Sequence, residues 1–375
     1  MSGYFTRADN SVLSRWWWTV DKWSLGALAG LIAVGALLTY AASPASASRI
    51  GLDSFHFVRQ QAVLLPIALA LMLAVSVLSA HWVKRLAVIL LGAALIGMLL
   101  TLVVGAEYKG ASRWLSVLGQ SLQPSELMRP TLAVFCAWML SQTRKEPGFP
   151  GLLITVIAVA MVIWILVSQP DLGMATLIGA VALVQLFVAG LPVIWVASVI
   201  GIGLAGLITA YYALPHVAGR INAFRDPSGS DTYQIDRSLE AFVNGGLFGR
   251  GPGEGTVKAL LPDAHSDFIF AVAGEEFGLI ACLVIVGLYA FVVLRGMARV
   301  LEEENFFVVL AATGLLAGFG LQALVNMASA LSLIPTKGMT LPFISYGGSS
   351  LLALALGMGM VLALTREGAG KAGHA

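Results

Sequence analysis

The chain has very few charged residues. Asp, Glu, Lys and Arg make up 11% of its 375 positions, whereas hydrophobic residues make up 58%. A soluble domain carries roughly 25% charged residues, so a chain of this composition could not cover its own surface with polar groups. Its solvent must be mostly lipid. The net charge of +2 is small and gives no reason to expect nucleic acid as a partner.

Cysteine is also scarce. The two cysteines, Cys136 and Cys282, both lie inside apolar runs, where a thiol behaves as a small buried hydrophobic group. They do not form a disulfide framework, and no Cys/His cluster has the spacing of a zinc site. The sequence therefore defines no metal ligands and indicates no organic cofactor.

Long apolar runs dominate the rest of the chain, and most approach the roughly 20 residues that a membrane-spanning helix needs. They predict an all-α polytopic membrane protein with about ten transmembrane helices. The runs lie near residues 24–42, 57–79, 84–105, 125–142, 151–168, 172–190, 192–213, 268–294, 306–331 and 341–364. Residues 42–47 resemble a signal-peptidase site, but the preceding run is longer than a signal core of about 7–15 residues, which favours an uncleaved anchor.

The runs divide the chain into one membrane domain and two tails. The membrane domain covers residues 24–365, and the tails are residues 1–23 and 366–375. Aromatic and basic residues at the end of the first tail are typical of a membrane-interface anchor. The large polar segment 214–266 is predicted to be a single extracytoplasmic loop, too short and glycine-rich to form an independent domain.

Basic residues predict the orientation, because Lys and Arg favour the cytoplasmic side. With both termini in the cytoplasm, eleven fall inside: Arg7, Arg15, Lys22, Lys84, Arg85, Arg144, Lys145, Arg295, Arg299, Arg366 and Lys371. Five fall in the short outer loops: Arg49, Arg59, Lys109, Arg113 and Lys337. We therefore expect residues 106–124, 214–266 and 332–340 to lie outside.

Asp267 is the main candidate for chemistry, because it lies where the polar loop meets the apolar run from residue 268. An ionisable group at the mouth of an intramembrane region is a functional candidate, since lipid makes its charge costly. The simpler interpretation is that Asp267 caps the following helix, and the two roles can coexist. His265 and Asp263 lie in the same turn.

Glu275 and Glu276 follow in the same run. They are predicted to lie on the same helix, roughly 12–14 Å below Asp267, at about 1.5 Å per residue. At least one of them should face a polar cavity or a cation, because a bare charge in lipid is costly. A structural ion pair, a protonated carboxyl and a contact with substrate all remain open.

A second cluster combines Lys109, Arg113 and Trp114. It suits an anionic, amphipathic ligand, because Arg pairs with phosphate and Trp favours the headgroup level. Anchoring to membrane lipid headgroups is the alternative. Glu126 and Arg129 are three residues apart and could pair on one helix face.

Three loops have simpler interpretations. Asp171 is expected to cap the helix that follows it. The glycine-rich segment 245–255 is no Walker A motif and is expected to bend sharply. Residues 335–350 form a bent, polar approach to the last helix, expected to be an unwound start whose backbone is satisfied by hydroxyl groups.

These blocks, in this order, resemble the SEDS family (shape, elongation, division and sporulation) of bacterial cell-wall polymerases. The resemblance covers nearly the whole chain from residue 24. It rests on KGASRW at 109–114, QPSE at 123–126, QPDLG at 169–173, GGLFGRG at 245–251, HSDFIFAVAGEEFG at 265–278 and LPFISYGGSS at 341–350. Residues 335–338 resemble the members that act in division rather than in elongation. Arg237 and Asp263 depart from the family's pattern of Gln and Glu.

The resemblance implies that the protein polymerises lipid II into glycan strands at the outer face of the bacterial inner membrane, at the division septum. It implies that Asp267 is the catalytic base and that Lys109, Arg113 and Arg220 offset the charge of the leaving pyrophosphate, aided by a divalent cation, Mg or Mn. The other substrate-binding candidates are Trp114, Glu126, His265, Glu275, Lys337, Ser345, Gly347 and Gly348.

The resemblance also implies partners: a class B penicillin-binding protein transpeptidase of the FtsI-like type, other divisome proteins and membrane lipids. Two other functions remain open. The chain could be a transporter that flips lipid II, because polar residues within spans suit a translocation path. It could also be a non-catalytic divisome scaffold that recruits a partner synthase.

The predicted orientation can be tested by cysteine labelling in intact spheroplasts. A cysteine introduced near Ser228 should react with a membrane-impermeant reagent, because the loop 214–266 is expected outside. A cysteine near the C-terminus should be protected. The reverse pattern would overturn the orientation.

Overall fold

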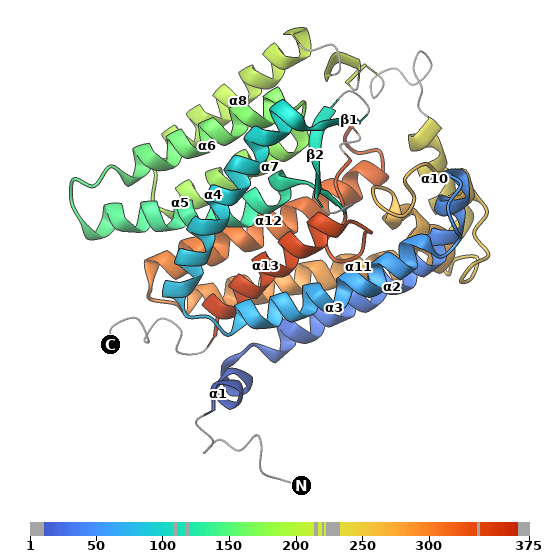
Figure 1. The fold of residues 1–375 in the computed structure, drawn as a ribbon, viewed down its shortest axis with the longest axis horizontal. Helices are drawn as coiled ribbons and strands as arrows, with labels where there is room; N and C mark the ends of the chain where they lie inside the picture. Colours follow the sequence, from blue (N-terminus) through green and yellow to red (C-terminus); the bar gives the residue numbers. More distant parts are fainter. Residues whose placement is uncertain are drawn as a thin grey trace.

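The computed structural model describes residues 11–108, 111–117, 120–213, 217–219, 221–222, 233–335 and 338–366. Most of these residues are helical, and long helices run side by side in one bundle (Figure 1). The predicted apolar runs correspond to helices α2 (Lys22–Arg49), α3 (His56–Ser76), α4 (Ala80–Val104), α5 (Pro124–Lys145), α6 (Gly151–Ser168), α7 (Leu172–Val188), α8 (Val193–Ala213), α11 (Ile269–Leu301), α12 (Phe306–Ala330) and α13 (Gly348–Leu364). The all-α membrane fold is thus confirmed.

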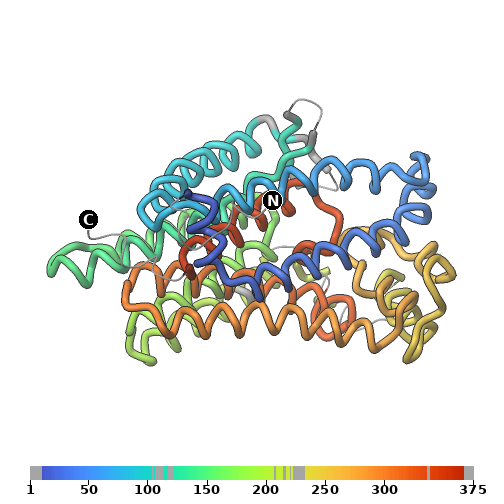
Figure 2. Tube along the Cα trace, turned by 90° about the horizontal axis from the view of Figure 1, so that it is seen from below, coloured from blue at the N-terminus to red at the C-terminus, as the bar shows by residue number. Residues whose placement is uncertain are grey.

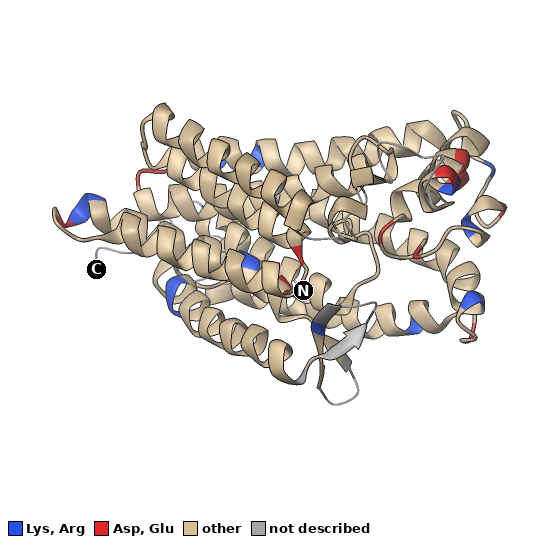
Figure 3. Cartoon of the chain, turned by 90° about the horizontal axis from the view of Figure 1, so that it is seen from above, with Lys and Arg blue, Asp and Glu red and all other residues tan. Residues whose placement is uncertain are grey.

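Seven of the described helices are long and apolar enough to cross a membrane. Helices α7 and α13 are apolar but have only 17 residues each, or about 26 Å against a hydrocarbon core of about 30 Å. Helix α5 carries charges at both ends. Figure 3 shows the charged residues mainly toward the ends of the helices. Ten complete crossings stay a prediction.

Helix α12 occupies the centre of the bundle, where it contacts α5, α7, α11 and α13. Helices α2 and α11 pack side by side along one edge (Figure 2). Helix α8 lies at the periphery, and the most apolar part of its length has no buried residue. This arrangement makes α12 the element from which a polar side chain can reach most of the core.

The two ends of the described chain meet at the same turn. Residues 1–23 were expected only as a tail, but they contain helix α1 (Val12–Thr19), and Trp16 donates to the Ser76 hydroxyl at 2.9 Å. Arg366, after α13, donates to the Leu78 carbonyl at 3.3 Å. Both ends therefore lie on one side of the bundle, as an even number of spans requires. Which side is cytoplasmic stays a prediction.

Two segments predicted as loops contain regular structure. Residues 106–124 include the antiparallel strands β1 (Ala106–Tyr108), β2 (Ala111–Val117) and β3 (Gln120–Leu122), in the order β1-β2-β3. The segment 214–266 includes α10 (Tyr233–Gly245) and the short 3-10 helix η2 (Val257–Ala259). Ser238 on α10 donates to the Ala330 carbonyl at 2.6 Å, which ties this segment to the end of α12.

Helix α11 is interrupted at Gly278, where φ is 78°. The prediction of one continuous helix over 268–294 is therefore wrong at this position. The glycine-rich segment 245–251 lies against the break and supplies the missing hydrogen-bond partners. Four backbone bonds join the two segments: Arg250 N to Glu275 O (3.0 Å), Gly251 N to Glu276 O (3.0 Å), Leu279 N to Gly246 O (2.9 Å) and Ile280 N to Leu247 O (3.3 Å).

We expect Gly278→Ala to destabilise the protein strongly. A Cβ atom at position 278 would lie 2.4 Å from Gly249 N and from Leu247 O, and the backbone conformation, with φ 78° and ψ −177°, adds a cost of about 1–3 kcal/mol for any residue but glycine. Gly287→Ala is the control, because nothing lies within 4 Å of its Cβ position and Ala favours a helix by about 1 kcal/mol over Gly. Thermal unfolding in detergent should separate the two variants. Equal midpoints would contradict the role of the break.

Candidate active site

Asp267 lies in a series of turns over residues 261–268, and its side chain is partly exposed. Helix α11 starts two residues later, and its N-cap position is Phe268, whose side chain makes no capping hydrogen bond. The interpretation of Asp267 as a helix cap is therefore wrong. Its backbone N–H donates to the Asp263 carbonyl at 3.1 Å, and Asp263 itself has a left-handed φ of 52°. The turn that contains Asp267 therefore precedes α11 and is not the first turn of that helix.

Asn326, on the central helix α12, holds this turn from the inside. Its side chain is 2% exposed, and its Nδ2 donates to the Asp267 carbonyl at 2.9 Å and to the Met339 carbonyl at 2.5 Å. Residue 338, just before Met339, passes close to the carboxylate: a Cβ atom on Gly338 would lie 3.4 Å from Asp267 Oδ2. The segment before α13 therefore forms one wall of the site.

Ser345 connects the same two segments a second time. Its hydroxyl donates to the Ser266 carbonyl at 2.5 Å and accepts from the Leu341 N–H at 2.7 Å. Helix α13 starts only at Gly348, and residues 341–347 are not helical. The expected unwound, hydroxyl-satisfied start is confirmed. Contact of Ser345, Gly347 or Gly348 with substrate stays a prediction.

His265 is packed among aromatic rings. Its ring stacks on Phe57 with centroids 4.0 Å apart and lies 5.7 Å from Tyr346, whose N–H donates to the His265 carbonyl at 2.9 Å. Burial lowers the pKa of His265 to about 4, although nearby Asp263 opposes this shift. The imidazole is therefore neutral at pH 7 and supplies shape, not charge, beside Asp267.

Glu275 and Glu276 are fully enclosed, at 0% and 1% exposed. Glu276 pairs with the Lys258 ammonium group, so the expected cationic partner for one of the two is confirmed. Glu275 accepts four hydrogen bonds of 2.8 Å each, from Asn244 Nδ2 and from the N–H groups of Thr256, Val257 and Lys258. This geometry supports the structural interpretation of both carboxylates and gives Glu275 no open face for a substrate.

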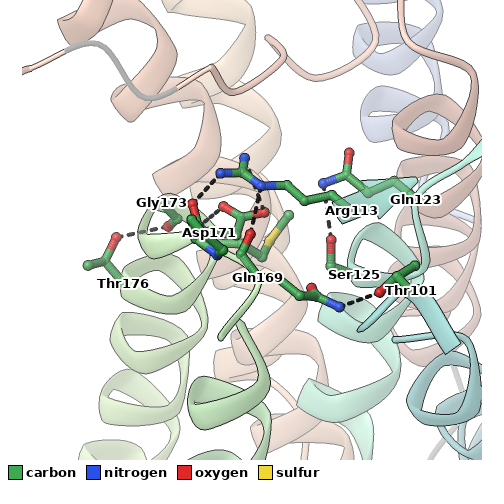
Figure 4. Close-up of polar contacts among 10 residues, drawn as sticks. Thr101, Arg113, Gln123, Ser125, Gln169, Asp171, Gly173 and Thr176 are labelled. Carbon is green, nitrogen blue, oxygen red and sulfur yellow. Dashed lines mark hydrogen bonds and ion pairs between the residues drawn. The ribbon is translucent and has the colours of Figure 1, made fainter. Parts of the chain in front are cut away.

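Arg113, in strand β2, binds the loop before α7 (Figure 4). Its Nε donates to the Gln169 carbonyl at 3.1 Å, another guanidinium nitrogen bonds to the Pro170 carbonyl, and Nη1 lies 3.8 Å from Asp171 Oδ2. Asp171 Oδ1 accepts from the Met174 N–H at 3.2 Å, so its predicted capping of α7 is confirmed. Arg113 thus connects the sheet to this turn. Its contacts give no direct support for a role of Arg113 in substrate binding.

Glu126 and Arg129 form the predicted pair on α5, with Arg129 Nη2 3.4 Å from Glu126 Oε2. Both are buried, at 8% and 6% exposed. Arg129 also bonds to Gln322 on α12, whose Nε2 donates to the Thr340 carbonyl at 2.8 Å. The pair is therefore linked through protein atoms to the segment that lines the Asp267 site.

Other predicted residues are placed differently. Trp114 is partly exposed and pairs with Ala106 in the sheet. Lys109, Arg220 and Lys337 lie outside the described residues, so their roles stay predictions. Within the described ranges, no three His, Cys, Asp or Glu side chains gather into a group that could hold a metal ion. The described residues therefore form no cage of their own for a divalent cation.

Asn326 was missed by the sequence analysis. The signal was present, because an amide in the apolar run 306–331 must find partners inside the bundle. Lys258 was missed as well: it is 7% exposed and pairs with Glu276. Neither partner could be identified from the sequence, since both contacts join distant segments.

Comparisons with known proteins agree over nearly the whole chain. The model of the FtsW/RodA/SpoVE family, described as "Cell cycle protein", matches residues 22–369. Proteins named "Probable peptidoglycan glycosyltransferase FtsW" are similar. The one from Caulobacter vibrioides is 45% identical over 98% of this chain and 95% of its own. Those from Geobacter metallireducens and Escherichia coli O157:H7 are 36% and 34% identical, over 88% and 92% of this chain and 91% and 86% of their own.

Solved structures also match nearly the whole chain. A chain reported for the structural coordination of polymerization and crosslinking by a peptidoglycan synthase complex matches with a TM-score of 0.75 and 28% identity, over 92% of this chain and 97% of its own. The rod shape determining protein RodA of Thermus thermophilus matches with a TM-score of 0.69 and 29% identity, over 93% and 97%.

The low pKa of His265 predicts a pH dependence of stability. The unfolded chain binds the proton near pH 6.5, whereas the folded protein binds it only at about pH 4. Stability should therefore be lost as the pH falls from about 6.5 toward about 4, by at most about 3 kcal/mol at about 1.4 kcal/mol per pKa unit.

Thermal unfolding midpoints across this pH range should show a smaller decline for His265→Phe, which keeps the ring stack without the titrating group. His81→Gln changes an exposed histidine in the first turn of α4 and should leave the decline unchanged. An unchanged decline in His265→Phe would show that other groups cause it.

Proposed function

The chain belongs to the FtsW/RodA/SpoVE family of cell cycle proteins, and we propose that it is a peptidoglycan glycosyltransferase of cell division in which Asp267 is the general base. The observation that carries the assignment of Asp267 is its partly exposed carboxylate in a turn whose backbone is held by buried side chains. The similar proteins named peptidoglycan glycosyltransferase support the reaction class.

The proposed reaction joins two lipid II molecules. Asp267 takes the proton from the 4-hydroxyl of the acceptor sugar as its oxygen attacks the anomeric carbon of the donor. A β-1,4 bond forms, and the bond from that carbon to the pyrophosphate of undecaprenyl pyrophosphate breaks. A positioned general base accelerates such a reaction roughly 10²–10⁴-fold.

A fixed carboxylate suits this step because the base must be within hydrogen-bond reach of the proton that it removes. The turn around Asp267 has its own backbone hydrogen bonds, so its conformation does not depend on whether the first turn of α11 frays. His265 beside it is neutral at pH 7, and the segment at Gly338 passes close to the carboxylate. In its ionised form this carboxylate can accept the proton of the acceptor hydroxyl.

The leaving pyrophosphate needs positive charge at the same side of the bundle. Lys109 and Arg220 remain the proposed sources, since the guanidinium of Arg113 already binds the loop before α7. A divalent cation held mainly by the pyrophosphate oxygens is compatible with the described residues, which form no cage of their own.

We further propose a class B penicillin-binding protein as partner, at the division septum, with both termini in the cytoplasm. A chain of this fold occurs in a peptidoglycan synthase complex that coordinates polymerization with crosslinking. The described part of this chain is a helical bundle with a small sheet, so crosslinking is assigned to a second protein. The proteins named FtsW among its relatives support the role in division.

Purified protein supplied with lipid II and its partner should make glycan polymer, and Asp267→Asn should lower the rate at least about 100-fold. Asn keeps the size of the side chain but cannot accept the proton. Membrane levels and partner binding should stay normal, because the backbone ties of the turn are unchanged. Polymer length and initial rate are the measurements.

Asp53→Asn is the control, since it makes the same chemical change at an exposed carboxylate that pairs with Arg59 at 2.9 Å. It should polymerise at the wild-type rate. A stable Asp267→Asn protein with wild-type activity would place the base elsewhere. Wild-type protein that makes no polymer even with its partner would favour a flippase or a scaffold.

A further inference from the structure

The Asp267 site is held by two side chains that join the same two segments of the chain. Asn326 bonds to the backbone of residues 267 and 339, and Ser345 bonds to the backbone of residues 266 and 341. Both side chains are buried, at 2% and 6% exposed. Neither bonds to the carboxylate itself. Their common effect is to fix the catalytic turn against the segment that forms its wall.

We infer that Asn326 and Ser345 are positioning residues that set where the carboxylate of Asp267 points. The inference rests on the proposed function, because it assigns a purpose to the rigidity of this turn. The two bonds from Asn326 come from one amide nitrogen on the central helix α12, so the bundle core itself defines the position of residue 267. Each hydrogen atom of that amide has its own carbonyl acceptor.

The orientation of a base matters because proton removal needs the acceptor hydroxyl within about 3 Å of the carboxylate. A misplacement of about 1 Å can cost about 100-fold in rate. Without Asn326, the carbonyl groups of residues 267 and 339 would lack their buried donor, and the turn would shift to find others. Binding of lipid II should change little, since Asn326 lies behind the turn.

The chain offers a close control in Gln185 on α7. Its side chain is 1% exposed, and its Nε2 also donates to two backbone carbonyls, those of Ala133 at 2.8 Å and Leu310 at 3.1 Å. Both amides leave a buried oxygen without a partner among the described residues. Gln185 therefore matches Asn326 in burial and bonding but has no contact with the Asp267 turn.

The experiment compares Asn326→Leu with Gln185→Met in the polymerisation assay with lipid II and partner. Both variants should lower the unfolding midpoint by similar amounts. Only Asn326→Leu should lower kcat, by about 10- to 100-fold, with KM for lipid II within about twofold of wild type. In an Asp267→Asn background, Asn326→Leu should change the remaining rate by less than about twofold, because residues that act as a unit are not additive.

Equal kcat values for Asn326→Leu and Gln185→Met, with Asp267→Asn inactive, would overturn this inference alone. The same fold-loss from Asn326→Leu with and without Asp267 would also overturn it. A wild-type rate in Asp267→Asn would overturn the base assignment as well.

If Asn326→Leu does not fold, Ser345→Ala carries the test. Its control is Ser141→Ala, another buried serine, whose hydroxyl donates to the Trp138 carbonyl at 2.8 Å. Ser345→Ala should lower kcat without changing KM, whereas Ser141→Ala should leave both unchanged. Equal kcat values for these two variants would overturn the inference.

Discussion

Irregular backbone inside an apolar bundle must have its polar groups satisfied by the protein, because lipid offers no hydrogen-bond partner. The structure meets this constraint at two positions near its functional centre. At Gly278, the glycine-rich segment 245–251 bonds to both halves of the broken helix. At Asp267, the side chains of Asn326 and Ser345 bond to the turn. Each solution brings together segments far apart in the sequence, and so fixes the site.

The same constraint separates the acidic residues into two groups. Glu275 and Glu276 lie on the short part of α11 before Gly278, where backbone N–H groups and Lys258 offset the free-energy cost of burying their charges. Replacing a single partner of such a buried charge costs far more than an exposed ion pair contributes. Asp267 lies in a turn and is partly exposed. The enclosed carboxylates are therefore structural, whereas the partly exposed Asp267 is the proposed base.

Local sequence patterns predicted the structural features that depend on residues close together in the sequence. The apolar runs gave the helices, the spacing of three gave the Glu126–Arg129 pair, and the position of Asp171 gave its cap. Contacts between distant segments could not be predicted from the sequence. The break at Gly278 depends on segment 245–251, and the partners of Arg113 lie over fifty residues away. The SEDS-like motifs pointed to Asp267, but only the packing shows that it is no helix cap.

In the proposed reaction, the ionised carboxylate of Asp267 removes the proton of the acceptor hydroxyl. The most direct measurement is the pH dependence of the single-turnover polymerisation rate in wild type and in Asp267→Asn, with lipid II saturating and partner present. If Asp267 is the base, the rate rises with pH through one ionisation in wild type and stays low without that rise in Asp267→Asn. The same rising limb in both proteins would contradict it and assign the ionisation to another group.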